Sequence, residues 1–366
     1  MSAHLGLFVA VEHRSSCSRR RRRDKKLFLR RRPEGAQRWR RRAQWTFLLL
    51  NLWIGAQFYH FVTAAERAAG GALPSRPPGV EGWLPIAGLM NLKYFLATGS
   101  IPAIHPAAMF LLGAFLTASI LFRKTFCSWL CPVGTVSERL WKAGRRFCGS
   151  NFLLPGWADL ALRIPKYALL AAFLFVTAAM PANAIAAFLG SPYGLIADVK
   201  LLDLFRRMGA TTAIVLSIIA VLSVFIKNFW CRFLCPYGAL MGLGSLFSPV
   251  WVRRNPEACI ECGKCRRACP SNLPVDTKLA IHSAECTGCL ECVSACPSEN
   301  ALDLSIMGRR TLGRRATDPR WLAAGIFAIF FGFVLYAKLS GHWETPIPDA
   351  AYRRLIQHSS EYGHPH

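Results

Sequence analysis

The chain has 366 residues, of which 53% are hydrophobic, and its 45 Lys and Arg outnumber its 20 Asp and Glu. This hydrophobic content excludes an intrinsically disordered protein, because disorder requires few apolar residues. The positive charge alone would permit a soluble nucleic-acid-binding protein, but long uncharged stretches of the sequence argue against one.

Residues 1–42 form a basic N-terminal segment with 15 Lys and Arg, most of them between Arg19 and Arg42. Next to a membrane span, such a run fixes topology and contacts anionic lipid, which is the role that we expect. No module that reads nucleic acid accompanies it. Further charges instead of an apolar segment follow Arg20, which excludes a twin-arginine export signal. The alternative is that residues 1–35 precede the true start of the protein.

Five stretches contain no Asp, Glu, Lys or Arg and approach the roughly 20 residues that a helix needs to cross a bilayer. Pro181 and Asn183 lie in the third, so we expect its outer end to be broken or re-entrant. Trp321 and Tyr336 bound the short fifth stretch, which suits a membrane interface. The sequence therefore predicts an integral membrane protein with about five spans. They are Ala43–Thr63, Ile104–Phe122, Tyr167–Leu189, Gly209–Ile226 and Trp321–Ala337.

The basic residues are distributed unequally between the loops. Segments 1–42, 123–166 and 227–320 carry 15, 8 and 13 Lys and Arg, whereas segments 64–103, 190–208 and 338–366 carry 3 each. The positive-inside rule assigns the first group to the cytoplasm. The sequence thus predicts a multi-pass protein of the bacterial cytoplasmic (inner) membrane, with a cytoplasmic N-terminus and a periplasmic C-terminus.

Two cysteine runs between the fourth and fifth stretches have the spacing C-x₂-C-x₂-C-x₃-C-P. This is the spacing of bacterial two-cluster ferredoxins, in which the fourth cysteine of each run ligates the other cluster. Zinc sites favour pairs of CxxC, and a reducing compartment disfavours disulfides. The predicted ligands are Cys259, Cys262, Cys265 and Cys296 for one [4Fe–4S] cluster, and Cys286, Cys289, Cys292 and Cys269 for the other.

A second cysteine motif, aromatic-Cys-x-aromatic-Leu-Cys-Pro-x-Gly, occurs twice. One copy follows the second apolar stretch and the other follows the fourth, which indicates an internal two-fold repeat. If each helix continues past the membrane, cysteines at i and i+4 share one face. Four such thiols suit a further cluster, a copper site or redox-active dithiols, and burial as small apolar side chains is the alternative. These residues are Cys127, Cys131, Cys231 and Cys235.

With both cysteine sets identified, the chain resembles the membrane-bound polyferredoxin group. Its members include the quinol dehydrogenase subunit NapH, the methylamine-utilisation protein MauN, the NosR and NirI proteins, and the oxidase assembly factor CcoG. The resemblance covers roughly residues 43–305 and rests on the paired CxxxCP motifs and the tandem ferredoxin runs. It implies that these twelve cysteines are the positions that correspond to the group's motifs.

The motifs indicate an electron-transfer function. Thiolate-ligated clusters carry one electron at a time, and no P-loop, dinucleotide-binding fingerprint or nucleophile–base pair indicates other chemistry. We expect electrons to pass between the quinone pool and a partner such as a ferredoxin-like subunit, a cytochrome c or a reductase. The alternatives are an assembly factor that reduces or delivers copper, and a redox regulator.

Three histidine positions are weighed as further sites. His60 and His105 are expected at the periplasmic interface at similar depth, where they suit a quinol headgroup or, less readily, a metal or haem. The alternative is that both bind lipid headgroups or neighbouring carbonyls. The tail Gly341–His366 suits copper in composition but is expected to be flexible. Its histidines are His342, His358, His364 and His366.

The expected fold is mainly α, with a polytopic bundle of about five spans and a small cytoplasmic α+β dicluster ferredoxin domain. Cluster ligation should supply much of that domain's stability. The expected segments are 1–42 (basic segment), 43–250 (four-span repeat with the CxxxCP motifs), 251–308 (ferredoxin domain), 309–340 (linker and fifth span) and 341–366 (periplasmic tail).

Overall fold

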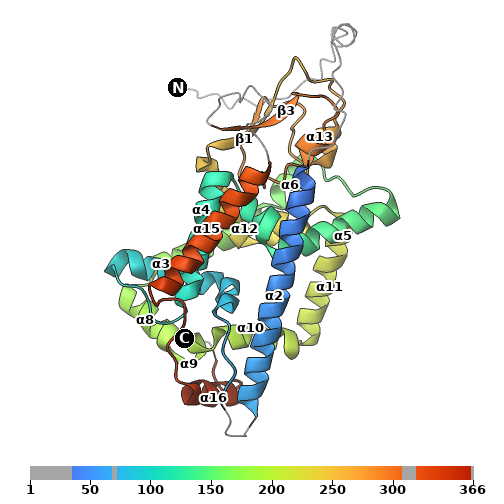
Figure 1. The fold of residues 1–366 in the computed structure, drawn as a ribbon. Helices are drawn as coiled ribbons and strands as arrows, with labels where there is room; N and C mark the ends of the chain where they lie inside the picture. The colour runs from blue at the N-terminus through green and yellow to red at the C-terminus, as the bar shows by residue number, and fades with distance from the viewer. Residues whose placement is uncertain (1–34, 68–71, 307–318, 364–366) are drawn as a thin grey trace, which may run out of the picture.

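The computed structural model describes residues 35–67, 72–306 and 319–363 (Figure 1). Most of the predicted basic segment lies outside these residues, as do the segment before the last long helix and the last two histidines of the tail. The described chain is mainly helical, with one small sheet at the end of the molecule where the first long helix begins.

The helices up to the second CxxxCP motif form an elongated body around α2, α4 and α11 (Figure 1). Short helices connect the long ones and cover the end away from the sheet. In chain order they are α2 (Ala36–Glu66), the 3₁₀ helix η1 (Pro78–Trp83), α3 (Pro85–Thr98), α4 (Pro106–Phe122), the π-helical turn η2 (Phe126–Leu130), α5 (Pro132–Cys148), α6 (Gly156–Ala161), α7 (Ile164–Ala179), α8 (Ala182–Gly190), α9 (Pro192–Leu195), α10 (Ala197–Arg206), α11 (Ala210–Phe225) and the π-helical turn η3 (Trp230–Leu234).

The rest of the chain forms the sheet with its short helices, and then returns along the body. The elements are α12 (Pro236–Gly244), the 3₁₀ turn η4 (Ser245–Phe247), β1 (Val250–Arg254), α13 (Lys264–Ala268), β2 (Ala280–Ile281), α14 (Glu291–Ala295), β3 (Leu302–Ile306), α15 (Pro319–Leu339) and α16 (Asp349–Gln357). The sheet has the order β2-β1-β3 and both pairings are antiparallel. We call residues 250–306 the ferredoxin unit.

Three described helices are long and apolar enough to cross a membrane: α2, the continuous segment Gly156–Ala179, and Arg320–Leu339 within α15. The number rises to four if α10 and α11, which meet at 81°, form one broken span. α4 is apolar but has only 17 residues. The structure therefore has several of the expected apolar helices, although it does not establish five complete spans.

The third predicted span, Tyr167–Leu189, is broken near Pro181, as expected from its sequence, and its apolar helix also starts earlier than predicted. α7 ends at Ala179, and Pro181 precedes the separate short helix α8. Proline cannot donate the backbone hydrogen bond that a continuing helix needs. The long apolar segment instead extends toward the N-terminus, to Gly156.

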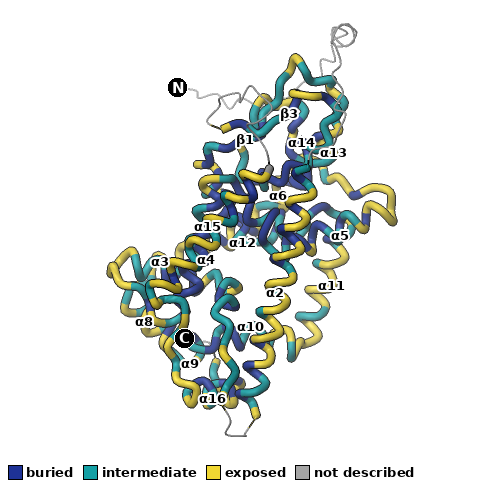
Figure 2. Tube along the Cα trace, viewed as in Figure 1, coloured by how far each residue is buried: buried dark blue, intermediate teal, exposed yellow. Residues whose placement is uncertain are grey.

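The outer surface of the helical body is unusually apolar. Exposed residues line α2 and α11 along most of their length (Figure 2), and large hydrophobic side chains are among them. Contiguous apolar surface of this kind is rare on soluble monomers and suits contact with lipid. Examples on the long helices are Leu52, Trp53, Phe175, Ile214, Val221, Leu335 and Tyr336.

Candidate iron–sulfur and thiol sites

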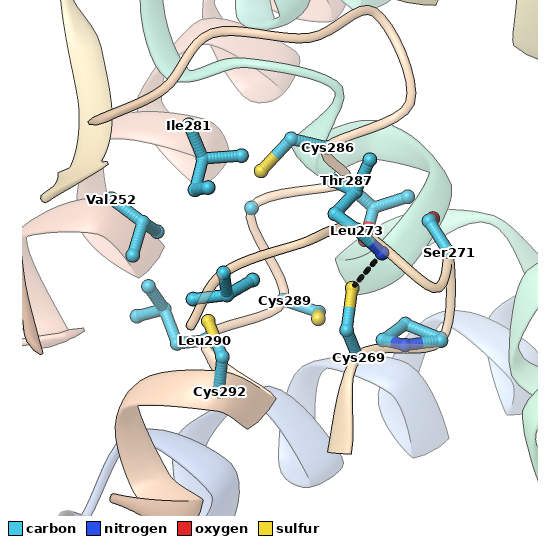
Figure 3. Close-up of a pocket in the computed structure, with 13 residues that line it drawn as sticks. Val252, Cys269, Ser271, Leu273, Ile281, Cys286, Thr287, Cys289, Leu290 and Cys292 are labelled. Atoms are coloured by element: carbon cyan, nitrogen blue, oxygen red, sulfur yellow. Dashed lines mark hydrogen bonds between the residues drawn. The ribbon is translucent and has the colours of Figure 1, made fainter. Parts of the chain in front are cut away.

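Two cavities in the ferredoxin unit are each lined by four cysteines. One, with about 330 Å³ of empty space, lies among Cys259, Cys262, Cys265 and Cys296. The second, with about 370 Å³, is lined by the other four cysteines of the tandem runs and by apolar side chains such as Val252 (Figure 3). The structure thus groups the eight cysteines into the same two sets as the spacing. In each set, three cysteines come from one run and the fourth comes from the other run.

The loops that carry these cysteines have a matching backbone conformation. Glu261 and Gly263 flank the second cysteine of the first run with φ of 56° and 66°. Gly288 and Leu290 flank the second cysteine of the second run with φ of 60° and 57°. Left-handed residues among right-handed ones turn successive N–H groups toward one concave side, an arrangement that binds anions and occurs at iron–sulfur sites. The backbone therefore suits negatively charged thiolates and their cluster.

Backbone donors reach the sulfur atoms directly. The Leu273 N–H donates to Cys269 Sγ over 3.4 Å, as Figure 3 shows, and the Glu261 N–H donates to Cys259 Sγ over 3.5 Å. Burial raises the pKa of Cys289 to about 12 and that of Cys265 to about 11. These thiols would be protonated without a metal, whereas coordination deprotonates a thiol outright.

The donor set of each cavity also suits a cluster. Four thiols line each cavity, and four thiolates are the ligands that a [4Fe–4S] cluster needs. The cysteine sets therefore fit [4Fe–4S] clusters in donor chemistry and in arrangement.

Both CxxxCP motifs adopt the same local structure, a π-helical turn. The Cys131 N–H donates to the Phe126 carbonyl over 2.9 Å, and the Cys235 N–H donates to the Trp230 carbonyl over 3.0 Å, both five residues back. The expected continuation of an α-helix is thus replaced by a wider turn, which is common at functional sites. The proline that follows each second cysteine begins the next helix, where its missing N–H costs nothing.

Three of the CxxxCP thiols, those of Cys127, Cys231 and Cys235, lie near a buried cation. Lys124 is only 2% exposed. Burial raises the pKa of Cys127 to about 12, while the positive charge of Lys124 opposes this rise; the neighbouring Cys131 and Cys235 raise it further. A Cβ atom at Gly238 would lie 3.6 Å from both Lys124 Nζ and Cys235 Sγ. A positive charge is therefore placed where a thiolate-ligated centre would carry negative charge.

A third cavity, with about 530 Å³ of empty space, connects the CxxxCP motifs to the ferredoxin unit. Cys127 and Cys231 line it on one side, and Cys289 and Thr287 line it on the other. Cys289 also lines the second ferredoxin cavity. Cys289 therefore borders both the second ferredoxin cavity and the cavity that reaches the CxxxCP thiols.

Hydrogen bonds hold the loop that precedes Cys289 against the first π turn, η2. The Ser128 hydroxyl donates to the Thr287 carbonyl over 2.6 Å, and the Trp129 indole donates to the Gly288 carbonyl over 3.3 Å. A Cβ atom at Gly288 would lie 2.8 Å from the Thr125 side chain. This position thus requires glycine both for its positive φ and for close approach to the turn.

Buried ion pairs complete the attachment of the ferredoxin unit. Arg40, 1% exposed, contacts Glu138 at 2.6 Å and Glu291 at 2.7 Å, and so joins α2, α5 and α14. On another side, Lys166 contacts Glu285 at 2.6 Å. These partners are not evident in the sequence, since Arg40 belongs to a basic run for which lipid contact is expected.

The two histidines considered for a quinol site lie in different environments. His60 is exposed on α2. His105 is fully buried and immediately precedes α4, with one ring nitrogen 3.2 Å from Glu81 Oε1 and the other 2.8 Å from the Gly194 carbonyl. Both ring nitrogens of His105 have protein partners, so its role toward a quinol stays a prediction. His342 lies just after α15, and its copper role also stays a prediction.

Comparison with known families gives matches over both cysteine regions. A family model described as a 4Fe-4S dicluster domain matches residues 251–297. Another, described as a 4Fe-4S binding domain, matches twice, over residues 104–150 and 208–256. These two segments each contain one CxxxCP motif. No solved structure matches the chain significantly.

Several curated proteins are similar to the chain. YccM of Escherichia coli (strain K12), whose name assigns it provisionally to electron transport, is 46% identical over 90% of this chain and 92% of its own length. NapH of the same organism, a ferredoxin-type protein, is 27% identical over 50% of this chain and 59% of its length. NirI of Paracoccus denitrificans is 29% identical over 49% of this chain but only 26% of its own length.

Proposed function

The chain belongs to the membrane-bound polyferredoxin group, and from this premise we propose that it passes electrons between the membrane quinone pool and a partner redox protein. The observation that carries the proposal is the position of Cys289, which lines the second ferredoxin cavity and also the cavity that reaches the CxxxCP thiols. Redox centres at these places would form a continuous series from the membrane helices to the surface of the ferredoxin unit.

Two [4Fe–4S] clusters form the outer part of this series. Each cluster, when bound, accepts and donates one electron at a time. The polypeptide supplies four thiolates to each, turns backbone N–H groups toward the sulfurs, and fixes the distance between the clusters through the exchanged cysteines. Those residues are Cys259, Cys262, Cys265 and Cys296 for the first cluster, and Cys269, Cys286, Cys289 and Cys292 for the second.

The CxxxCP thiols form the inner part, as ligands of a third metal–thiolate centre. Burial raises the pKa values of Cys127, Cys131 and Cys231, which supports this assignment, as does the 4Fe-4S description of the family model that matches both motifs. Copper ligation and dithiol chemistry use the same four residues, so iron analysis separates these alternatives. The centre would be Cys127, Cys131, Cys231 and Cys235.

The orientation in the membrane is proposed from charge. The ferredoxin unit lies at the same end of the molecule as the start of α2, and α16 lies at the opposite end (Figure 1). Among the described residues, the segments at the first end carry more Lys and Arg than those at the opposite end, which supports a cytoplasmic ferredoxin unit and a periplasmic C-terminus. Cysteine labelling of intact cells tests this orientation. A thiol reagent that does not cross the membrane should label Arg353→Cys and should not label Lys278→Cys.

Anaerobic purification followed by iron and sulfide analysis tests the number of centres. Two clusters require about eight irons per chain and a third about twelve. Replacing Cys289 with Ser should remove one cluster signal from the electron paramagnetic resonance spectrum. The matched control is Cys148→Ser, because Cys148 is exposed and belongs to no motif.

Reduction of the clusters by a quinol tests the proposed link to the quinone pool. Ubiquinol or menaquinol analogues should reduce the clusters of the purified protein in lipid nanodiscs within the time of enzyme turnover. Iron-free preparations would contradict the iron–sulfur assignment altogether. Clusters that methyl viologen reduces but quinols do not would contradict the quinone link and favour a regulator or an assembly factor.

A further inference from the structure

A large open groove separates α5 from the two short helices of the ferredoxin unit. It has about 1210 Å³ of empty space, more than twice that of any cysteine-lined cavity described above. α13 and α14 form one side, and the last two turns of α5 form the other. Its lining residues are Trp141, Lys142, Arg145, Arg146, Lys264, Arg267, Ala268, Glu291 and Ala295.

The groove is strongly basic. Five of its nine lining residues are Lys or Arg, and Glu291 is the one acid. Lys142 and Arg40 contact that acid, both at 2.7 Å, so its charge is already paired. The charges that remain available to a partner are those of Arg145, Arg146, Lys264 and Arg267, all exposed.

The groove also lies directly beside the cluster ligands. Lys264 precedes Cys265, Ala268 precedes Cys269, Glu291 precedes Cys292 and Ala295 precedes Cys296. Two of these cysteines line each cluster cavity. The Arg267 guanidinium donates to the carbonyl of Cys262 over 3.0 Å, which links the basic surface to the first cluster loop. A molecule seated in the groove is thus within one residue of ligands of both clusters.

We propose that this groove docks an acidic, water-soluble one-electron carrier protein. The proposal rests on the electron-transfer function above and names the partner class. Complementary charge speeds the encounter of redox proteins and orients them without requiring a large buried area. In the electron-transfer step, one electron leaves the reduced carrier and enters an oxidised cluster, so the carrier is oxidised and the cluster reduced by one electron, with no proton or bond change.

Anionic lipid headgroups are the other class that basic residues attract. Arg145 and Arg146 are followed by Phe147, which is 85% exposed, so this end of α5 suits a membrane interface. Lys264 and Arg267 instead belong to the ferredoxin unit and sit next to the cluster ligands. Their position favours the protein carrier, and it makes these two residues the informative ones to change.

The test follows cluster reduction by stopped-flow in nanodiscs of uncharged lipid, with a strongly acidic [2Fe–2S] ferredoxin, chemically reduced, as the probe. The double variant Lys264→Glu/Arg267→Glu should lower the second-order rate constant at low ionic strength by about tenfold. The wild-type rate should fall with added salt, whereas that of the variant should depend on salt weakly or inversely. Lys278→Glu is the matched control, because Lys278 is exposed on the same unit but outside the groove.

Methyl viologen radical reduces clusters without a protein docking site and separates the possible failures. Equal reduction of variant and wild type by this small reductant shows that the clusters are intact. An acidic ferredoxin that reduces the double variant as fast as the Lys278→Glu control would overturn the docking proposal and leave the proposed function standing. Wild-type protein that methyl viologen does not reduce would overturn both. If the double variant loses binding to phosphatidylglycerol vesicles while ferredoxin kinetics stay unchanged, the groove is a lipid site.

Discussion

Replacing Arg40 with Met should loosen the attachment of the ferredoxin unit to the helical body. The Arg40 guanidinium contacts Glu138 through both terminal nitrogens, at 2.6 and 2.8 Å, and Glu291 at 2.7 Å, and it is 1% exposed. Removing one partner of a buried ion pair costs roughly 3–5 kcal/mol, because the other charge is left without compensation. Lys142 still contacts both carboxylates, at 2.6 and 2.7 Å, which places the expected loss at the lower end, about 3 kcal/mol.

Amide hydrogen exchange measures this loss as local opening. Since every 1.4 kcal/mol is a factor of ten, amides of residues 286–296 should exchange about 100-fold faster in the variant under conditions where opening is at equilibrium. Arg41→Met is the matched control, because Arg41 is the next residue on α2 but exposed. Its exchange rates should stay close to those of the wild-type protein.

A second variant distinguishes an unpaired charge from lost packing. Arg40→Met combined with Glu138→Met replaces two charged partners by apolar side chains, a change that is often nearly neutral. Exchange in the double variant should therefore be slower than in Arg40→Met alone. If Arg40→Met and Arg41→Met exchange alike, the buried pair contributes nothing to the attachment and the reasoning is refuted.

Three further predictions concern pH, packing and cluster loss. Burial alone would raise the pKa of Glu138, but the hydrogen bond and charge of Arg40, together with Lys142, lower it to about 2; its contribution to stability is therefore complete above pH 4.5 and is lost as the pH falls from about 4.5 toward 2, which exchange in residues 286–296 should follow. Gly134→Ala should remove any CxxxCP metal signal, because its Cβ would lie 2.2 Å from the Cys127 carbonyl oxygen, whereas Gly156→Ala meets nothing within 4 Å and should leave that signal unchanged. Removing the clusters with oxygen and chelator should make residues 257–305 sensitive to protease while the long helices stay protected in the membrane; equal resistance with and without clusters would contradict this.

The cysteine arrangement was the part of the site most accessible from sequence. Ligand spacing in the two ferredoxin runs is local, and the exchange of the fourth cysteine follows from a backbone that turns at each run. The structure puts Cys296 in the cavity of the first run and Cys269 in that of the second. The sequence did not reveal the π turns, because periodicity distinguishes α from π geometry poorly over five residues. The repeated aromatic-Cys pattern was the available signal that these two segments share one local structure.

Apolar length predicted where long helices occur but not where they end. Ala43–Thr63 lies within α2, which extends to Ala36 and Glu66. In the third stretch, the break that Pro181 predicts is confirmed, whereas the extension of the apolar segment to Gly156 was not predicted, because charged residues lie within it. Hydropathy records composition, whereas helix ends depend on backbone donors and on the packing of neighbouring chain segments.

The buried ionic contacts could not be predicted, since their partners are distant in sequence. Arg40 and Glu138 are 98 residues apart, and Lys166 and Glu285 are 119 apart. A single sequence gives no signal that connects such residues. His105 shows the same limit: its expected position near the outer interface gave no indication of its contacts with Glu81 and the Gly194 carbonyl.

These ionic contacts also explain how a small unit can hold a fixed distance to the thiols of the helical body. A three-stranded sheet with two five-residue helices offers little apolar core of its own. Buried ion pairs add little net stability but fix one arrangement, because any other arrangement leaves charges unpaired. Arg40 and Lys166 act at different points of the interface, which restrains both sliding and rotation. The proposed electron transfer between a centre at the CxxxCP thiols and a cluster at Cys289 would require that restraint, since Cys289 lines both cavities in this arrangement.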